Sequence, residues 1–186
     1  MAKAARSLDI VTPPFLVAFA HVWEPRAFEG EPEDKAKYGV SMVFDADADI
    51  AGLKAAASKV ARDQWGDNIP AEMKNPFLDA GAHSQHEGFE PGGMFIRATS
   101  QRDRPPGVVG PDTRPITVQS DFYSGCRAVA LVNFYAWERR TGCGVSCGLI
   151  HLQKIADGDP LGSSAPKPAD VFHAVGAPSA ADMFDL

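Results

Sequence analysis

The longest stretch of alternating side chains, residues 127–140, constrains the fold of this chain more than any other feature. Every second position from Ala128 to Ala136 is small or apolar, and the positions between them mix arginines with aromatic side chains. Such alternation is typical of a β-strand that buries one face. Residues 141–144 predict a turn and residues 145–155 a return strand, which together form a long hairpin. The small face of the first strand suits the interior of a closed barrel.

The rest of the chain predicts a mainly β domain with one helix. Further strands are expected over residues 15–23, 38–44 and 93–100. Pro25 ends the first of these because proline cannot donate to a strand ladder, and the second alternates as a half-buried strand. Residues 66–92 and 101–114 are rich in glycine, proline and polar side chains and are expected to be connections.

Residues 48–65 carry the one convincing helical pattern. Apolar positions recur at helical spacing, and lysine and arginine lie on the opposite side. Asp45 or Asp47 is the expected N-cap, and Gly66 follows the last periodic position. This helix therefore falls between two predicted strands.

Length and composition restrict the class of protein. A chain of 186 residues is long enough for about one domain. The longest apolar run, Phe15–Ala20, is far shorter than the roughly 20 residues of a membrane span, so no membrane association is expected. Three cysteines make a disulfide framework improbable and favour a reducing, cytoplasmic setting.

Charge is distributed unevenly along the chain, which has a net charge of −6. Residues 94–140 hold seven arginines against four carboxylates, whereas residues 156–186 hold five aspartates against one lysine. The acidic end is poor in large apolar side chains, so residues 163–186 are predicted to form a disordered acidic tail. Residues 1–14 are predicted to be a flexible lead-in.

No residues in the sequence predict a metal site, a cofactor site or an enzyme. Cys143, Cys147 and His151 lie four residues apart, and in a strand four residues span about 13 Å, which is too long for ligands of one zinc ion. His83 and His86 lie in a connection with no obvious thiol partner. Phosphate-binding, dinucleotide-binding and hydrolase signatures are absent, so the chain is expected to be non-enzymatic and to use no cofactor.

The basic and aromatic face of the predicted strand over residues 127–140 admits two interpretations. Single-stranded nucleic acids bind where bases stack on aromatic rings and cations follow the phosphates. Phe95 and Arg97 repeat the same mixture on another strand. The alternative is a non-enzymatic, oligomeric β-barrel that serves as a protein-interaction module and buries this face between subunits.

Three stretches resemble a known family. They are Val22-Trp23-Glu24-Pro25-Arg26-Ala27 with Tyr38-Gly39-Val40-Ser41, then Phe122-Tyr123-Ser124-Gly125-Cys126 with Asn133-Phe134-Tyr135-Ala136, and finally the segment from Gly148 to Gly162. Together they resemble phage-encoded single-stranded-DNA-binding proteins related to the T7-type replication protein. The resemblance implies an OB-fold over residues 15–162, that is, a five-stranded Greek-key barrel with one inserted helix.

The resemblance also implies a function: binding of single-stranded DNA without sequence preference, in phage-type DNA replication or recombination. The residues expected to hold phosphates are Lys37, Arg97, Arg102, Arg104, Arg127 and Arg139. The residues expected to stack on bases are Tyr123, Tyr135 and Trp137. The residues expected to recruit replication or recombination proteins, or to compete with DNA, are Asp182, Met183, Phe184, Asp185 and Leu186. A homodimer is compatible with this function, and a phage-encoded protein would act in the cytoplasm of its bacterial host.

Overall fold

The computed structural model describes residues 4–27, 30 and 32–162 of the chain. Its elements in chain order are β1 (Ile10–Val11), β2 (Phe15–Arg26), η1 (Glu33–Lys35), β3 (Lys37–Phe44), α1 (Ala51–Trp65), β4 (Phe77–Asp79), η2 (Gly81–His83), β5 (Met94–Gln101), β6 (Gly107–Val109), η3 (Gln119–Asp121), β7 (Arg127–Arg139) and β8 (Gly142–Ala156). The acidic tail predicted over residues 163–186 lies outside the described residues.

Five of the strands close into a barrel. Around the ring, β2 pairs with β3, β3 with β5, β5 with β8, β8 with β7, and β7 with β2. All of these pairings are antiparallel except that of β5 with β8. The ring has the strand order of an OB-fold, and α1 is inserted between its second and third strands. The predicted mainly β, OB-like fold with one inserted helix is therefore confirmed.

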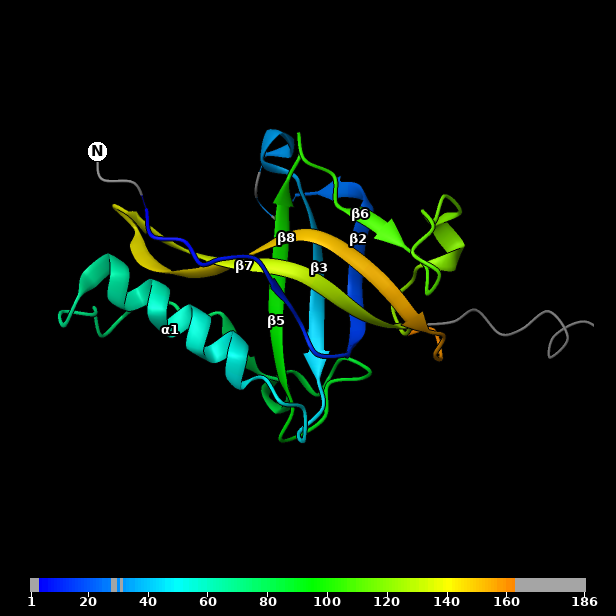
Figure 1. The fold of residues 1–186 in the computed structure, drawn as a ribbon, viewed down its shortest axis with the longest axis horizontal. Coiled ribbons are helices and arrows are strands. Elements are labelled where there is room, and N and C mark those ends of the chain that lie inside the picture. The colour runs from blue at the N-terminus through cyan, green and yellow to red at the C-terminus, as the bar shows by residue number, and fades with distance from the viewer. Residues whose placement is uncertain (1–3, 28–29, 31, 163–186) are drawn as a thin grey trace, which may run out of the picture.

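The barrel interior is filled by the face of β7 that the alternation identified. Ala128, Val132, Phe134 and Ala136 are at most 1 % exposed and lie in the main core. The long β7–β8 hairpin crosses the other three strands and projects beyond the barrel beside α1 (Figure 1). The alternating pattern thus predicted both the longest strand pairing and its buried face.

The second and third strands differ from expectation. The end of the first strand at Trp23 was predicted wrongly, because β2 continues through Pro25 to Arg26, which pairs with Lys37. The half-buried character of β3 was also predicted wrongly, because its last five residues are buried on both faces. One face enters the barrel, and on the other Val43 packs beneath the connection that follows α1.

The helix has the predicted C-terminal end but not the predicted N-cap. It runs from Ala51 to Trp65, its C-cap is Gly66, and its N-cap is Ile50, whose side chain makes no capping bond. Neither Asp45 nor Asp47 caps the helix. Instead, Asp49 Oδ1 accepts a hydrogen bond from the backbone N–H of Ala51 at 3.0 Å. Within the described residues, no helix is both long enough and apolar enough to cross a membrane.

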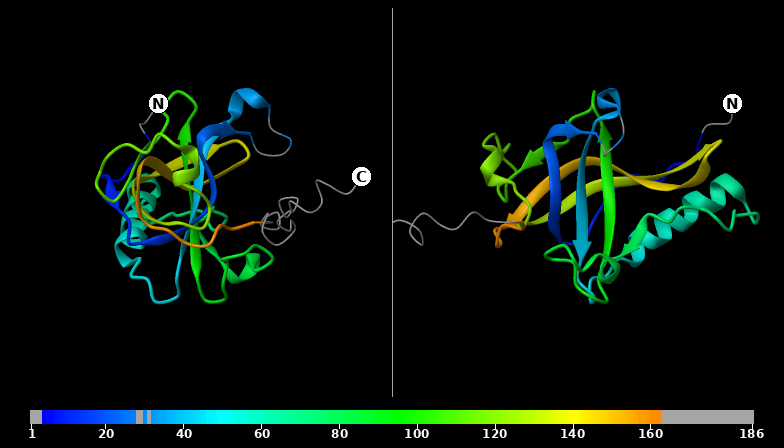
Figure 2. Two further views of the ribbon diagram at one scale, coloured as in Figure 1. Left: turned by 90° about the vertical axis from the view of Figure 1, so that its right-hand side faces the viewer. Right: turned by 180° about the vertical axis from the view of Figure 1, so that it is seen from behind.

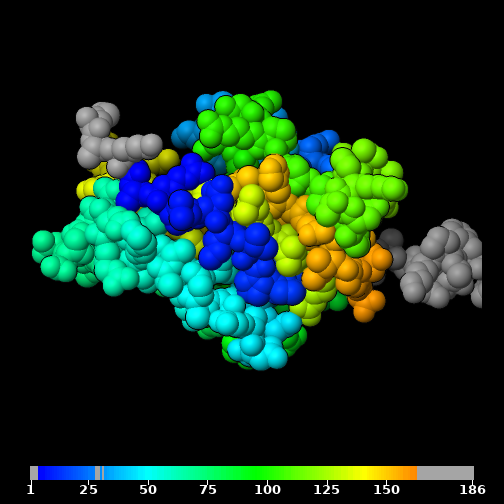
Figure 3. Space-filling view, in the orientation of Figure 1, coloured from blue at the N-terminus to red at the C-terminus, as the bar shows by residue number. Residues whose placement is uncertain are grey.

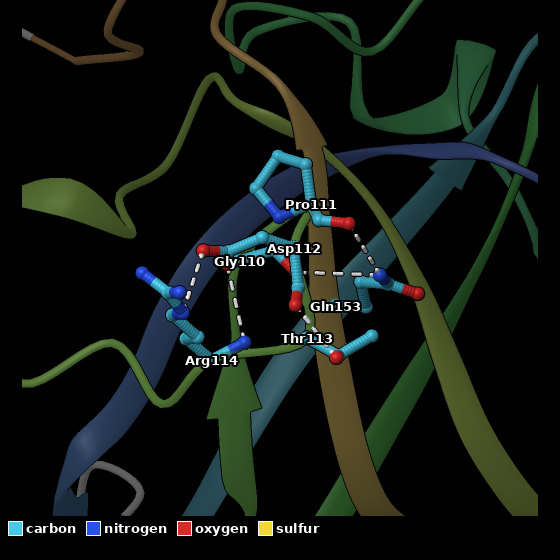
Figure 4. Close-up of polar contacts among 6 residues, drawn as sticks. All are labelled: Gly110, Pro111, Asp112, Thr113, Arg114 and Gln153. Carbon is cyan, nitrogen blue, oxygen red and sulfur yellow. Dashed lines mark hydrogen bonds and ion pairs between the residues drawn. The ribbon is translucent and has the colours of Figure 1, made fainter.

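Both predicted connections contain short strands. Residues 66–92 include β4, which pairs with β5, and residues 101–114 include β6, which pairs in parallel with β8. A turn over residues 110–114 follows β6, where Asp112 Oδ1 accepts the backbone N–H of Arg114 (3.1 Å), and Gln153 Nε2 of β8 donates to the Gly110 carbonyl (3.2 Å; Figure 4). These bonds hold the turn against the barrel.

The N-terminal segment lies along the outside of β7. Ile10 and Val11 pair with Val132 and Leu131, and the backbone N–H of Ser7 donates to the carbonyl of Phe134 at 2.8 Å. In the space-filling view the segment lies across the barrel wall, above α1 (Figure 3). This face of the barrel is therefore partly covered by the chain itself.

Candidate nucleic-acid interface

A groove of about 540 Å³ runs along the outer face of β2, β3 and β5, the three neighbouring strands seen side by side from behind in Figure 2. The floor comes from the outward positions of β3, because Val40 and Met42 point into the core. Those outward positions are Lys37, Gly39 and Ser41. This groove is called the β3 groove below.

Strand register orders the side chains along the β3 groove. Arg26 lies beside Lys37 at one end, His21 lies beside Gly39, and Arg97 lies beside Ser41 further along. Four residues of β-strand separate Lys37 from Ser41, a distance of about 13 Å. The three cations are therefore distributed along the groove, two at one end and one further in.

The other end of the β3 groove is aromatic. Phe19 meets His86 edge to face with ring centroids 5.2 Å apart and lies 6.1 Å from Phe89. His83 meets Phe95 in the same way at 5.1 Å, and Phe95 meets Phe89 at 5.0 Å. The guanidinium carbon of Arg97 lies 5.5 Å from the Phe95 ring centroid. One wall thus combines flat aromatic surface with an adjacent positive charge.

The exposed ring in this wall depends on an irregularity in β2. The register with β3 shifts between Ala18 and His21, so β2 contains an extra residue there. Phe19 lies in this bulge with φ of 48°, a conformation that bulky side chains rarely adopt, and it is 45 % exposed. Such strain is often retained at binding sites, where it orients a functional side chain.

Three of the predicted DNA contacts lie in or beside the β3 groove. Lys37 and Arg97 line it. Arg102 follows β5, and its Nη1 donates to the Glu33 carbonyl oxygen at 3.5 Å. The structure therefore brings Lys37 of β3 close to Arg97 and Arg102, which lie some 60 residues later in the sequence, on β5 and directly after it.

Two further predicted contacts lie in a second hollow of about 530 Å³ between β5, β7, β8 and the N-terminal segment, called the β5–β8 trough below. Arg104 and Tyr135 line it together with Arg6, which the sequence analysis did not single out. Thr99 lines both the trough and the β3 groove. The two hollows therefore adjoin at this residue of β5.

Trp137 and Arg139 lie further out on β7, near the end of the hairpin. The Arg139 guanidinium carbon lies 6.0 Å from the Trp137 ring, and Lys74 Nζ lies 5.9 Å from it. Tyr135, Trp137 and Arg139 alternate along one face of β7, as the sequence pattern predicts. They make a second basic and aromatic surface, separate from the walls of the β3 groove.

Tyr123 and Arg127 lie apart from both surfaces and contact other parts of the protein. The Tyr123 hydroxyl is 3.0 Å from Asp157 Oδ1 and 2.9 Å from the Gly158 carbonyl oxygen. Arg127 Nη1 forms an ion pair with Asp45 at 2.9 Å. The structure therefore does not bring these two residues together with the other predicted contacts.

The Tyr123 contacts belong to a clasp that closes one end of the barrel. Residues 123–126 pack against residues 157–160 so closely that the backbone of Gly125 touches that of Gly158 and Asp159. Hydrogen bonds from Lys154 Nζ, at 2.6 Å, and from Tyr123 lower the pKa of the Asp157 carboxyl. Two of the stretches that carry the family resemblance thus meet in space.

Several side chains of the β3 groove were not predicted from the sequence to contact DNA. They are Phe19, His21, Arg26, Tyr38, His86 and Phe89. The run of aromatic and histidine side chains in residues 83–89 was a signal, but only the fold shows that this connection lies over β5. The five predicted tail residues, Asp182 to Leu186, lie outside the described residues.

Comparison with known proteins places these surfaces in a family context. Residues 8–184 match the model of the family described as Enterobacter phage Enc34, ssDNA-binding protein. The structure of the single-stranded DNA-binding protein from bacteriophage Enc34 in complex with ssDNA is similar at a TM-score of 0.67 and 16 % identity, over 83 % of this chain and 89 % of that one.

A second similar structure comes from another phage. It is gp2.5, a single-stranded DNA binding protein encoded by bacteriophage T7, with a TM-score of 0.63 and 13 % identity over 92 % of this chain and 98 % of that one. At these identities the two structural similarities concern the fold. No curated protein sequence matches the chain.

Proposed function

The chain belongs to the family of the Enterobacter phage Enc34 ssDNA-binding protein, and on that premise we propose that it binds single-stranded DNA in the β3 groove without sequence preference. The observation that carries this proposal is the combination of the exposed rings of Phe19 and His86 with unpaired cations on the face of an OB-fold that binds oligonucleotides. Within the described residues, none of Arg26, Lys37 and Arg97 forms an ion pair.

The order of side chains along the groove assigns each end a role. Bases stack on the aromatic wall around Phe19, and each stacked base contributes about 1–3 kcal/mol. Phosphates lie against Arg26, Lys37 and Arg97, which are spaced along the floor. Stacking of this kind tolerates every base, since each base has a π-face, and so it supports binding without sequence preference.

The bound DNA strand then continues over Thr99 into the β5–β8 trough and along the β7–β8 hairpin. Arg104 and Arg139 hold phosphates on this second surface, and Tyr135 and Trp137 stack on bases. Arg102 holds a phosphate at the cationic end of the groove. A contact of DNA with Tyr123 or Arg127, also predicted from the sequence, would compete with the bonds that these side chains make within the protein.

The role of the protein in the cell is proposed from the family resemblance. The protein coats single-stranded DNA during phage-type replication or recombination, in the cytoplasm of a bacterial host. Residues 182–186 recruit replication or recombination proteins, because their apolar side chains among aspartates suit a basic-rimmed groove on a partner. The protein catalyses no reaction in this role, and a homodimer is compatible with it.

Fluorescence anisotropy of a labelled oligo-dT of about 15 nucleotides, a length within the range that one OB-fold covers, tests the proposal. We expect salt-sensitive binding to the single strand in preference to the matching duplex. The full chain and a version ending at Gly162 are compared, and tighter binding by the shorter version indicates competition by the tail. Absence of binding by both versions at low salt contradicts the proposal.

Phe19→Ala is expected to weaken binding of oligo-dT by about 1–3 kcal/mol while leaving the salt dependence unchanged, because it removes a stacking surface and no charge. Anisotropy titrations at several salt concentrations measure both quantities. Phe19→Tyr keeps the ring and is the matched control. Wild-type affinity in Phe19→Ala would mean that the bulge in β2 serves the fold and not the DNA.

A further inference from the structure

Three of the five histidines in the chain line the β3 groove. His21 lies on β2 beside Gly39 of the floor. His83 ends η2, and His86 follows it in the connection that forms the aromatic wall. This cluster is not evident from the sequence, because the histidines come from two segments some 60 residues apart.

The charged and titratable groups that face these histidines are almost all cationic. Arg26 comes from β2, Lys37 and the Tyr38 phenol from β3, and Arg97 from β5. Among the described residues, no aspartate or glutamate lines the groove. The neighbouring Glu87 carboxylate accepts the backbone N–H of Gly162 at 3.1 Å and so points to the chain end beyond β8.

We infer that His21, His83 and His86 are additional DNA contacts, and that His21 takes up a proton when the DNA strand binds, so that affinity rises as the pH falls. The inference rests on the proposed function, since it requires the strand to occupy this groove. Histidine is the side chain whose charge changes between about pH 5 and pH 8, and an imidazole ring also stacks on bases. Each of the three residues therefore offers a ring to the bases, and His21 also offers a positive charge once it is protonated.

The direction of the effect follows from the groove's own charges. In the free protein, burial and the positive charge of Arg26 lower the pKa of His21 from its usual 6.5. A bound phosphate neutralises Arg26 and adds a negative charge near the ring, so the pKa of His21 is higher in the complex. A group with a higher pKa in the complex binds a proton on association, and the complex gains affinity as the pH falls toward that value.

The aromatic contacts keep His83 and His86 in place for this role. Each lies edge to face with a phenylalanine, His83 with Phe95 and His86 with both Phe19 and Phe89. Offset and edge-to-face pairs of this kind favour fixed ring positions. Both imidazole rings are therefore held in the wall on which bases stack.

Anisotropy titrations of the full chain with oligo-dT at about pH 8 and about pH 6 test the inference, since histidine gains its charge between these values. We expect the affinity to rise about tenfold or more at the lower pH. We also expect the slope of log affinity against log salt to steepen by about 0.7, because His21 gains one charge beside a phosphate. Binding with equal affinity and slope at both pH values overturns the inference but leaves the proposed function intact, whereas absence of binding at both contradicts the proposed function.

The variant His21→Gln removes the imidazole that gains the proton. It should lose the gain in affinity between about pH 8 and about pH 6, whatever its affinity at about pH 8. The double variant His83→Phe/His86→Phe, which leaves β2 untouched and retains two aromatic rings, should keep the gain, and thermal unfolding of each variant verifies that it folds. A pH dependence that survives in His21→Gln overturns the inference.

His151→Gln is the matched control outside the groove. His151 lies in the β5–β8 trough, where its Nδ1 accepts the backbone N–H of Gly107 at 3.1 Å, a contact that requires the unprotonated nitrogen. Because the proposed DNA path includes the trough, the absolute affinity of this variant can differ from that of the wild type, but we expect it to retain the full change of affinity between the two pH values. Loss of the pH dependence in His151→Gln would show that the proton taken up on DNA binding goes to His151 in the trough, and this result would overturn the inference.

Discussion

Gly125→Ala is expected to lower the free energy of unfolding by about 3–5 kcal/mol, because it combines steric overlap with a strained backbone. Gly125 has φ of 118°, a region that side chains other than hydrogen rarely allow, and a Cβ there would overlap the Asp159 carbonyl. The overlap involves backbone on both sides, so no side-chain rotation relieves it. Urea unfolding followed by tryptophan fluorescence, with linear extrapolation, measures the loss.

The variant Gly142→Ala distinguishes the cost of the strained backbone from the cost of the steric overlap. Gly142 also has a positive φ, 140°, but no atom lies within 4 Å of its Cβ position. We expect this variant to lose only about 1 kcal/mol, which is the cost of the backbone conformation alone. Equal losses in the two variants would show that the clasp between residues 123–126 and 157–160 does not pack as tightly as the structure indicates.

The combined variant Arg26→Ala/Lys37→Ala/Arg97→Ala is expected to reduce the salt slope of oligo-dT binding by about 2, because each phosphate contact on a single strand contributes about 0.7. Affinity in ~0.1 M salt should fall about 100-fold, and the wild type and the variant should converge toward 1 M. Anisotropy titrations across this range of salt measure both effects.

A second triple variant controls for the loss of net charge. Lys54, Lys59 and Arg62 are exposed on α1, and none of them lines the β3 groove. Replacing all three by alanine changes the net charge by the same amount as the groove variant. We expect a nearly unchanged salt slope. If both variants lose the same slope, DNA is attracted by the total charge of the protein and not by the cations of the groove.

The elements that the sequence predicted correctly are those whose pattern is local. The alternation over residues 127–140 gave β7 and its buried face, and helical spacing gave α1. The N-cap was wrong because Asp49, not Asp45 or Asp47, bonds to the first turn. The end of β2 was wrong because Pro25 lies near the end of a strand whose register with β3 is already irregular.

The aromatic wall of the β3 groove could not be predicted in the same way. The face of β2 on which a residue lies cannot be predicted by counting alternate positions past Phe19, because the bulge shifts every later residue to the other face. Phe89 and the two histidines of the wall come from a connection whose position depends on packing against Val43 and Phe95. Such packing joins segments distant in sequence, and one sequence carries no periodic signal of it.

Two seams of the barrel are much shorter than the others. β5 pairs with β8 at two positions, Ala98 with Cys147 and Thr99 with Gly148, and β2 also pairs with β7 at two, whereas β7 and β8 pair at thirteen. Local opening should begin where the fewest pairs must separate, so amide hydrogens near these two seams exchange sooner than those of the hairpin. Thr99 of the β5–β8 seam is also where the two hollows adjoin, so a DNA strand that spans both hollows would hold this seam closed and slow its local opening.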